Sequence, residues 1–178
     1  LRLGRPVQQV GQFGGVPEFE FQQIIAVIPL PDDGFAVADW GGFLISLFDR
    51  RGVRTGVLGG VGGGPGEFQS LMSVFPYRGV SIVAHDARSN RLTVFALSDA
   101  TPRTMQPCGE HLGYLPSVKG AFPDGTMLLT RSERGEYSGD RRPLVVMTCS
   151  SEGDLLSEFG RFPGTQTHVV NELENVWF

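Results

Sequence analysis

The chain repeats itself at an interval of 47 residues, and this repeat limits its possible folds more than any other feature. Two phenylalanines and a proline recur at this spacing. The matched sets are Phe21 with Phe68, Phe48 with Phe95, and Pro29 with Pro76 and Pro123. A fixed period between 20 and 50 residues is typical of proteins built from stacked structural repeats.

The third copy keeps the 47-residue register through Glu133 and then slips by five residues. Leu92 and Phe95 of the second copy then correspond to Leu144 and Met147. An insertion is therefore predicted within residues 134–143. Insertions of this kind are tolerated best in surface loops, so we expect a loop there.

Each copy contains four short segments with the pattern of a β-strand. In the first copy they cover residues 24–29, 35–39, 43–48 and 53–58, and in the second they cover 71–76, 80–85, 91–95 and 103–106. The third segment alternates, as Ile45-Ser46-Leu47 illustrates, which is typical of a half-buried strand. Asp32-Asp33-Gly34 predicts a hairpin turn in which glycine takes the positive φ. A helical period is absent.

Four strands in about 47 residues is the size of one β-propeller blade. The predicted fold is therefore all-β, with blades of four antiparallel strands. The 25 glycines and 12 prolines agree with many tight turns, and 13 phenylalanines argue against disorder.

Charge and hydropathy exclude two classes of partner. The net charge is −4 and the basic residues are scattered, whereas nucleic-acid binding needs clustered positive charge. No apolar run approaches the roughly 20 residues that span a bilayer, so no membrane span is expected.

Cys108 and Cys149 match no metal-ligand spacing. We expect two buried free thiols, with a single disulfide as the alternative.

Three motifs identify a family resemblance. They are Gly62-Gly-Gly-Pro-Gly-Glu-Phe68, Val83-Ala-His-Asp86 and Asn90-Arg-Leu-Thr-Val-Phe95. Together they resemble the bacterial six-bladed β-propeller proteins related to NHL repeats, over about residues 11–164. The first copy departs from the pattern, because Gly15-Val-Pro-Glu-Phe-Glu-Phe21 replaces the Gly-Pro-Gly-Glu-Phe core. The resemblance also implies a periplasmic or extracellular location.

Six blades of this length imply about 280 residues, whereas 178 residues hold about 3.8 repeats. We therefore expect an incomplete ring, with possible self-association through open blade edges. Residues 1–20 would end a preceding blade, and residues 160–178 would begin the next. The expected blades cover 21–58, 68–106 and 115–159.

The carboxylates Asp39, Asp86 and Glu133 each close the second strand of a copy. Grouped around one mouth they could bind a cation, which prefers oxygen ligands. The alternative, which we favour, is that each caps its own turn or pairs with an arginine such as Arg91. The candidates for a ligand-binding face are Asp39, Asp86, Arg88, Arg91, Glu133 and Arg134.

We predict no catalytic set, no metal site and no cofactor. The glycine-rich run at residues 59–66 lacks the Lys-Ser/Thr of a phosphate-binding loop, so a tight connection between blades is expected there. The predicted function is a non-catalytic binding or scaffold module whose loop face contacts a protein, peptide or glycan. The alternative is a metal-assisted, lactonase-like hydrolase, which rests on shared architecture alone.

Overall fold

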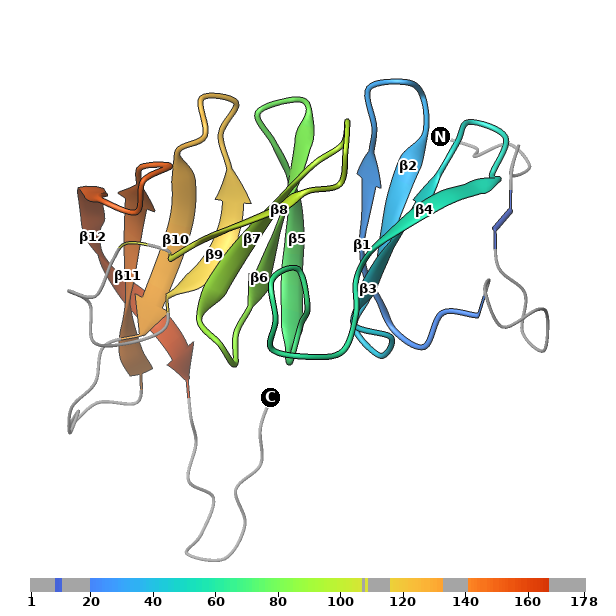
Figure 1. The fold of residues 1–178 in the computed structure, drawn as a ribbon. Coiled ribbons are helices and arrows are strands. Elements are labelled where there is room, and N and C mark those ends of the chain that lie inside the picture. Colours follow the sequence, from blue (N-terminus) through green and yellow to red (C-terminus); the bar gives the residue numbers. More distant parts are fainter. Residues whose placement is uncertain (1–8, 11–19, 107, 109–115, 133–140, 167–178) are drawn as a thin grey trace, which may run out of the picture. The chain divides into compact units, whose positions relative to one another are not determined.

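The computed structural model describes residues 9–10, 20–106, 108, 116–132 and 141–166. These residues form twelve strands and no helix (Figure 1). The strands make three separate four-stranded antiparallel sheets. The chain divides into two compact units, residues 1–106 with the first two sheets and residues 107–178 with the third. The predicted all-β class with blade-like sheets is thus confirmed.

The first sheet is a simple meander of β1 (Ile24–Pro29), β2 (Phe35–Asp39), β3 (Leu44–Phe48) and β4 (Arg54–Gly59). The order in the sheet is the order in the chain. In the turn between β1 and β2 the positive φ belongs to Asp33, at 61°, and not to Gly34 as predicted. Gly34 is needed for another reason, because a Cβ there would collide with the Phe48 carbonyl oxygen.

The second sheet repeats the first. It consists of β5 (Leu71–Tyr77), β6 (Ser81–Asp86), β7 (Arg91–Ala96) and β8 (Pro102–Met105). Val27 pairs with Val37 in the first sheet, and Val74 pairs with Ala84 in the second, 47 residues later in both strands. The predicted strands of the first two copies therefore agree with the structure to within one or two residues.

The third sheet consists of β9 (Ser117–Ala121), β10 (Met127–Ser132), β11 (Arg141–Cys149) and β12 (Leu155–Gln166). Residues 160–166 pair with β11, so they complete this sheet and do not start another, which corrects the prediction. Residues 141–143 of the predicted insertion belong to strand β11 and not to a loop. The rest of that insertion, residues 134–140, lies outside the described residues.

The register of the third copy also differs from the prediction. The Phe122 N–H donates to the Thr126 carbonyl oxygen at 2.7 Å, as the Leu30 N–H does to Gly34 at 2.9 Å in the first sheet. Pro123 therefore stands in the turn, where Pro31 stands, and not in a strand like Pro29. The spacing from Ile82 to its counterpart Met127 is consequently 45 residues.

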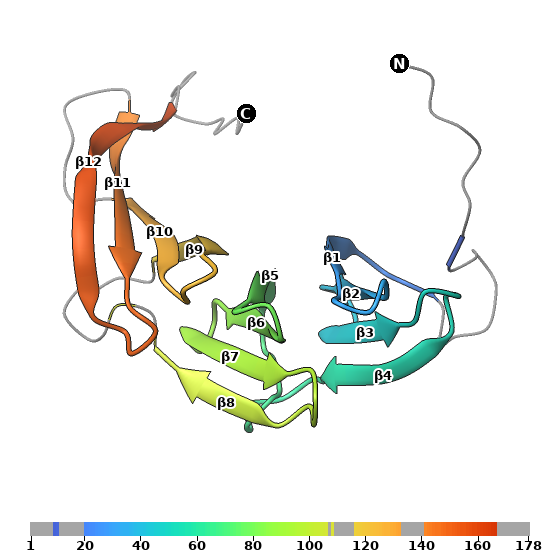
Figure 2. The same cartoon turned by 90° about the horizontal axis from the view of Figure 1, so that it is seen from above.

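The first and second sheets pack face to face within their unit, with β1 next to β5 (Figure 2). Their shared core is aliphatic and aromatic. It includes Ile28, Ala36, Ala38, Ile45 and Leu58 from the first sheet and Phe68, Leu71, Val74, Ile82, Ala84 and Phe95 from the second. Phe21 lies against Phe48 and Phe68 against Phe95, with ring centroids 6.3 and 6.1 Å apart and the same interplanar angle of 66°.

The two cysteines form a disulfide, so the expectation of free thiols is wrong. Cys108 and Cys149 are both buried, as predicted, and their Cα atoms are 5.4 Å apart. The bond joins residues 41 positions apart within the second unit. Cys149 ends β11 and Cys108 precedes β9, so the bond ties the segment before the third sheet to its third strand.

Candidate functional site

Asp39, at the end of β2, is buried and binds backbone N–H groups of its own sheet. Its carboxylate accepts hydrogen bonds from Gln22 at 3.1 Å, Gln23 at 2.7 Å and Gly41 at 3.2 Å. Two of these donors precede β1 and the third lies in the turn after β2. One side chain thus joins the entry of the sheet to its second turn.

Asp86 makes the same arrangement in the second sheet. Its carboxylate accepts hydrogen bonds from the N–H groups of Gln69 at 2.9 Å, Ser70 at 3.0 Å, Arg88 at 3.0 Å and Ser89 at 3.4 Å. Burial by itself would raise the pKa of Asp86. The hydrogen bonds from Gln69, Ser89 and Arg88 outweigh burial and lower that pKa below its ordinary value.

We call this arrangement the carboxylate bracket: Asp39 or Asp86 with its backbone donors before the first strand and after the second. Both brackets are accompanied by a backbone hydrogen bond at the same place, from Trp40 to Gln23 and from Ala87 to Ser70. The oxygens of the bracket are occupied by donors of their own sheet, so they hold the turns in place.

The third predicted carboxylate, Glu133, and its neighbour Arg134 lie outside the described residues. In the third sheet, the residue that corresponds to Asp86 is Arg131. It follows Met127 by four residues, as Asp86 follows Ile82, the counterpart of Met127. Arg131 forms an ion pair with Glu158 of β12, with 3.7 Å between the charged atoms. Among the described residues, no group of three or more His, Cys, Asp or Glu side chains could hold a metal ion.

Arg91 at the start of β7 contacts the glycine-rich connection instead of a carboxylate. Its guanidinium donates to the carbonyl oxygens of Gly63 at 3.1 Å and Glu67 at 2.6 Å. The Glu67 carboxylate in turn accepts the Gly64 N–H at 2.7 Å. Gly59, with φ of 92°, lies so close that a Cβ would stand 2.5 Å from the Phe68 ring. The connection is therefore a fixed structural element.

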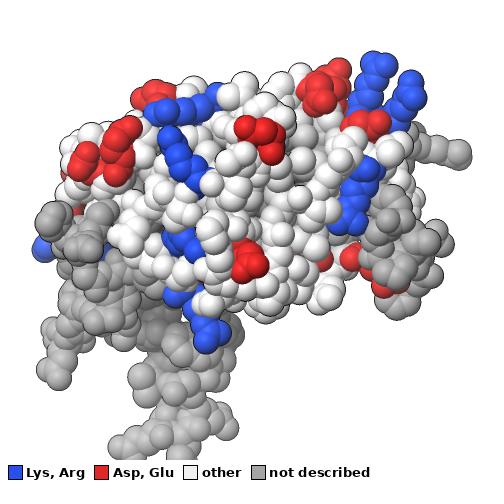
Figure 3. Space-filling view, in the orientation of Figure 1, with Lys and Arg blue, Asp and Glu red and all other residues white. Residues whose placement is uncertain are grey.

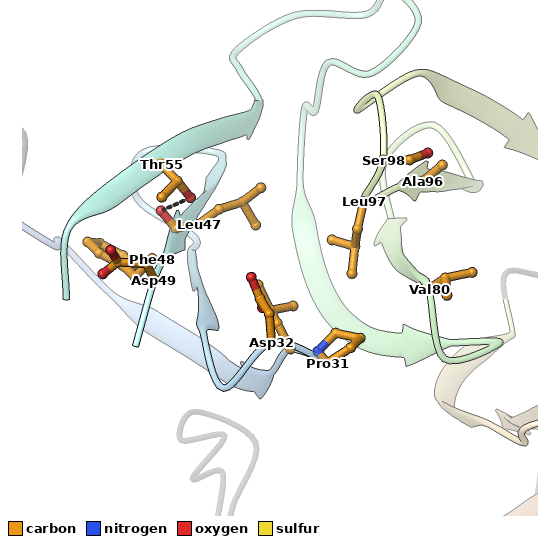
Figure 4. A pocket seen from close by; sticks show the side chains of 11 residues that line it. Pro31, Asp32, Leu47, Phe48, Asp49, Thr55, Val80, Ala96, Leu97 and Ser98 are labelled. Atoms are coloured by element: carbon orange, nitrogen blue, oxygen red, sulfur yellow. Dashed lines mark hydrogen bonds between the residues drawn. The ribbon is translucent and has the colours of Figure 1, made fainter. Parts of the chain in front are cut away.

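A cleft of about 600 Å³ opens between the first and second sheets, at the opposite end of the strands from the brackets (Figure 4). Its walls come from the turns after β1 and β3 of the first sheet and those before β6 and after β7 of the second. The lining residues are Leu30, Pro31, Asp32, Leu47, Phe48, Asp49, Thr55, Val80, Ala96, Leu97 and Ser98.

The cleft combines apolar walls with two carboxylates on one side. Leu47, Leu97 and Val80 supply apolar surface, and Asp32 and Asp49 lie on the first-sheet side (Figure 4). Asp49 is half-buried, and its Oδ1 accepts the N–H groups of Arg51 and Val53 at 2.8 and 2.9 Å. Asp32 is exposed to solvent.

This cleft could not be predicted from the sequence, because its residues share no motif. They come together only when two turns of one copy meet two turns of the next. Elsewhere on the face shown in Figure 3, acidic and basic side chains are interspersed over the described surface. On this face the acidic side chains are thus not gathered into one broad patch.

No family model matches the chain, and no curated protein matches it. Three solved structures are similar in fold. A Bacteroides fragilis protein inferred to be exported has a TM-score of 0.65 and 16% identity, with 86% of this chain and 42% of that one covered. The protein U3-55K has a TM-score of 0.54 and 15% identity, with 77% and 39% covered. A Bacteroides caccae protein of unknown function has a TM-score of 0.50 and 13% identity, with 80% and 50% covered.

These similarities show the fold alone, given their low identity. The chain spans half or less of the length of each of these proteins. Within the part of the chain that the structure describes, no helix is long and apolar enough to cross a membrane.

Proposed function

We propose that the protein is a binding module whose cleft between the first two sheets holds a segment of a protein or peptide ligand. The observation that carries this proposal is the cleft itself. Its volume of about 600 Å³ falls within the roughly 300–1,000 Å³ that is usual for ligand pockets, and its walls are largely apolar with few polar groups.

The lining indicates the kind of side chains that would fit. Leu30, Leu47 and Leu97 offer aliphatic contact, which favours an apolar residue of the ligand. Asp32 and Asp49 add negative charge at one wall, so a neighbouring lysine or arginine of the ligand would be attracted. A peptide that places a cationic side chain next to a leucine meets both requirements.

The alternative of a metal-assisted hydrolase has less support from these residues. It would need free carboxylate oxygens near one mouth. The oxygens of Asp39 and Asp86 instead accept three and four backbone hydrogen bonds. Using them as metal ligands would compete with these backbone hydrogen bonds, which hold the turns in place.

The experiment measures binding of two fluorescent peptides by anisotropy. The probe peptide is acetyl-Gly-Leu-Lys-Leu-Gly, and its counterpart carries Glu in place of Lys. We expect weak saturable binding of the lysine peptide, about tenfold weaker binding of the glutamate peptide, and loss of lysine-peptide binding in Val80→Lys, which adds a positive charge to the cleft. Val80 lines the cleft and is exposed, so its replacement spares the core.

Val61→Lys is the matched control, because Val61 is also well exposed but lies in the glycine-rich connection and does not line the cleft. Its binding should equal that of the unmodified protein. Equal binding of both peptides, or lysine-peptide binding that survives Val80→Lys, would contradict the proposal.

We further propose that the sheets are blades of a six-bladed NHL-type ring and that the protein works outside the cytoplasm. The 47-residue repeat and the longer proteins of similar fold support the first point. The disulfide between Cys108 and Cys149 supports the second, because such bonds persist in oxidising compartments. A protein whose thiols react with maleimide in whole cells without prior reduction would contradict this location.

A further inference from the structure

Asp49, which lines the cleft between the first two sheets, has one more carboxylate oxygen than its turn uses. Its Oδ1 accepts the N–H groups of Arg51 at 2.8 Å and Val53 at 2.9 Å, two and four residues later in the chain. Among the described residues, no donor bonds its second oxygen, Oδ2. The backbone thus fixes the carboxylate through one oxygen and leaves the other available.

The third sheet shows that a hydroxyl group is enough for the same turn. Ser150 corresponds to Asp49 by the register of the preceding strands. Its Oγ accepts the N–H groups of Glu152 at 3.1 Å and Asp154 at 3.0 Å, again two and four residues later. The backbone hydrogen bond that closes each turn is also the same, at 2.9 Å in the first sheet and 2.8 Å in the third. One acceptor oxygen completes this turn, so the fold needs neither the charge nor the second oxygen of Asp49.

The rest of the cleft offers hydrogen-bond acceptors and apolar surface but no basic side chain. No lysine, arginine or histidine is among the residues that line it, all of which the structure describes, and Arg50 and Arg51 lie outside the lining. Asp32 adds a second carboxylate on the first-sheet side (Figure 4). Thr55 donates its hydroxyl to the Leu47 carbonyl oxygen at 3.3 Å, and its own oxygen can still accept a hydrogen bond. A ligand in this cleft therefore has to supply the donors.

We propose that Asp49 selects an arginine of the ligand, so that the cation held in the cleft is a guanidinium and not an ammonium group. This inference rests on the proposed binding function. A guanidinium carries its N–H donors in a planar fork, which can reach Asp49 Oδ2 and a neighbouring acceptor at the same time. The partner is thus a peptide or protein segment with an arginine beside a leucine.

The apolar walls of the cleft also favour arginine over lysine. A guanidinium is more weakly hydrated than an ammonium group, so it loses less hydration energy when it enters a cleft walled by side chains such as Leu47 and Leu97. A lysine ammonium group is a compact, strongly hydrated charge that tends to stay in water. Both the acceptors and the walls therefore discriminate in the same direction.

Fluorescence anisotropy with three labelled peptides tests this inference. They are acetyl-Gly-Leu-Arg-Leu-Gly, its lysine counterpart, and its citrulline counterpart, in which a neutral urea group replaces the guanidinium. We expect the arginine peptide to bind about tenfold more tightly than the lysine peptide. The citrulline peptide has nearly the same shape without the charge and should bind the most weakly of the three.

Asp49→Ser separates the role of the charge from that of the turn. Because Ser150 completes the same turn, the melting temperature should match that of the unmodified protein. The arginine and lysine peptides should then bind equally weakly. Asp49→Asn keeps an acceptor oxygen for the turn without the charge and should give the same result, which guards against an unstable serine variant.

Asp99→Ser is the matched control. Asp99 also accepts a backbone N–H within a turn, from Thr101 at 2.9 Å, but it does not line the cleft. The preference for arginine should be unchanged in this variant. A preference that survives both Asp49→Ser and Asp49→Asn would overturn the role of Asp49.

The outcomes also separate this inference from the proposed function. Equal affinity of the unmodified protein for the arginine and lysine peptides, with both lost in Val80→Lys, would overturn the inference and leave the binding cleft in place. Saturable binding of neither peptide would overturn both.

Discussion

The Asp86 carboxylate accepts a hydrogen bond at 2.9 Å from the backbone nitrogen of Gln69, 17 residues before it in the chain. Asp39 stands in the same relation to Gln22, at 3.1 Å. One buried negative charge therefore fixes two loops in each sheet. The cost of burying the charge is offset because each carboxylate receives at least three backbone donors.

Replacing Asp86 by alanine should destabilise the protein by about 2–3 kcal/mol. Hydrogen bonds to a charged group contribute about 1.5–3 kcal/mol, and the released N–H groups of Gln69 and Ser70 would be left without partners. Urea denaturation measures the change. Asp32→Ala, at an exposed position, is the control and should alter stability by less than about 0.5 kcal/mol. Equal effects of the two substitutions would contradict the structural role of Asp86.

Stability should depend on pH through Asp86. Its pKa is lower in the folded protein than in the unfolded chain, so its contribution is complete above the unfolded value of about 3.9 and is lost as pH falls through the folded value. Asp86→Asn cannot ionise. The stability gap between the natural protein and Asp86→Asn should therefore be constant from pH 7 to about pH 5 and shrink in stronger acid. A gap that widens in acid would reverse the assigned sign.

Phe95→Ala should cost about 3–5 kcal/mol, as is usual for a buried phenylalanine. Phe95 is buried in the core between the first two sheets and contacts Phe68. Thermal or chemical denaturation would measure the loss. Phe159→Ala, in an exposed position on β12, should cost much less and controls for the loss of a ring in general. A mild effect of Phe95→Ala would refute the assigned packing.

Arg91→Lys should loosen the glycine-rich connection while keeping the charge. A single ammonium group cannot reproduce the planar fork that reaches the Gly63 and Glu67 carbonyl oxygens together. Hydrogen exchange of the amides between Gly62 and Phe68 should accelerate several-fold. Arg50→Lys, in an exposed turn, should leave these amides unchanged. Unchanged exchange in Arg91→Lys would show that the connection is held by its backbone contacts alone.

Reduction of the disulfide should lower the free energy of unfolding by about 3–4 kcal/mol, the amount expected for a closed loop of about 40 residues. Denaturation with and without dithiothreitol measures this difference. The double variant Cys108→Ser, Cys149→Ser should have the lower stability and should not respond to dithiothreitol. A response in the double variant would mean that the reductant acts elsewhere.

The first two copies could be predicted from sequence because their turns, strand lengths and phenylalanines coincide at one spacing. The third copy could not, because Pro123 matches two places. A proline suits both the edge strand that Pro29 occupies and the turn that Pro31 occupies, so its identity does not fix the register. The hydrogen bond from Phe122 to Thr126 decides for the turn.

Other features depend on contacts between distant segments. No spacing rule pairs Cys108 with Cys149, since only the fold brings their Cα atoms to a separation that allows a disulfide. An ion pair with a carboxylate was one of two alternatives that the sequence left open for Arg91, and the structure instead directs its guanidinium to the carbonyl oxygens of residues 24 and 28 positions earlier. The cleft likewise has no signature in the sequence, because each of its walls is an ordinary turn.

The carboxylate bracket has a consequence for how such a protein can change in length. All the donors to Asp39 lie between residues 22 and 41, and all those to Asp86 lie between residues 69 and 89. Gene duplication or loss of one whole 47-residue unit would therefore carry a complete bracket with it. A recombination breakpoint between Gln69 and Asp86 could instead join a carboxylate to a foreign first strand. Evolution by whole units is thus the route that preserves these contacts, and breakpoints are expected in the glycine-rich connections.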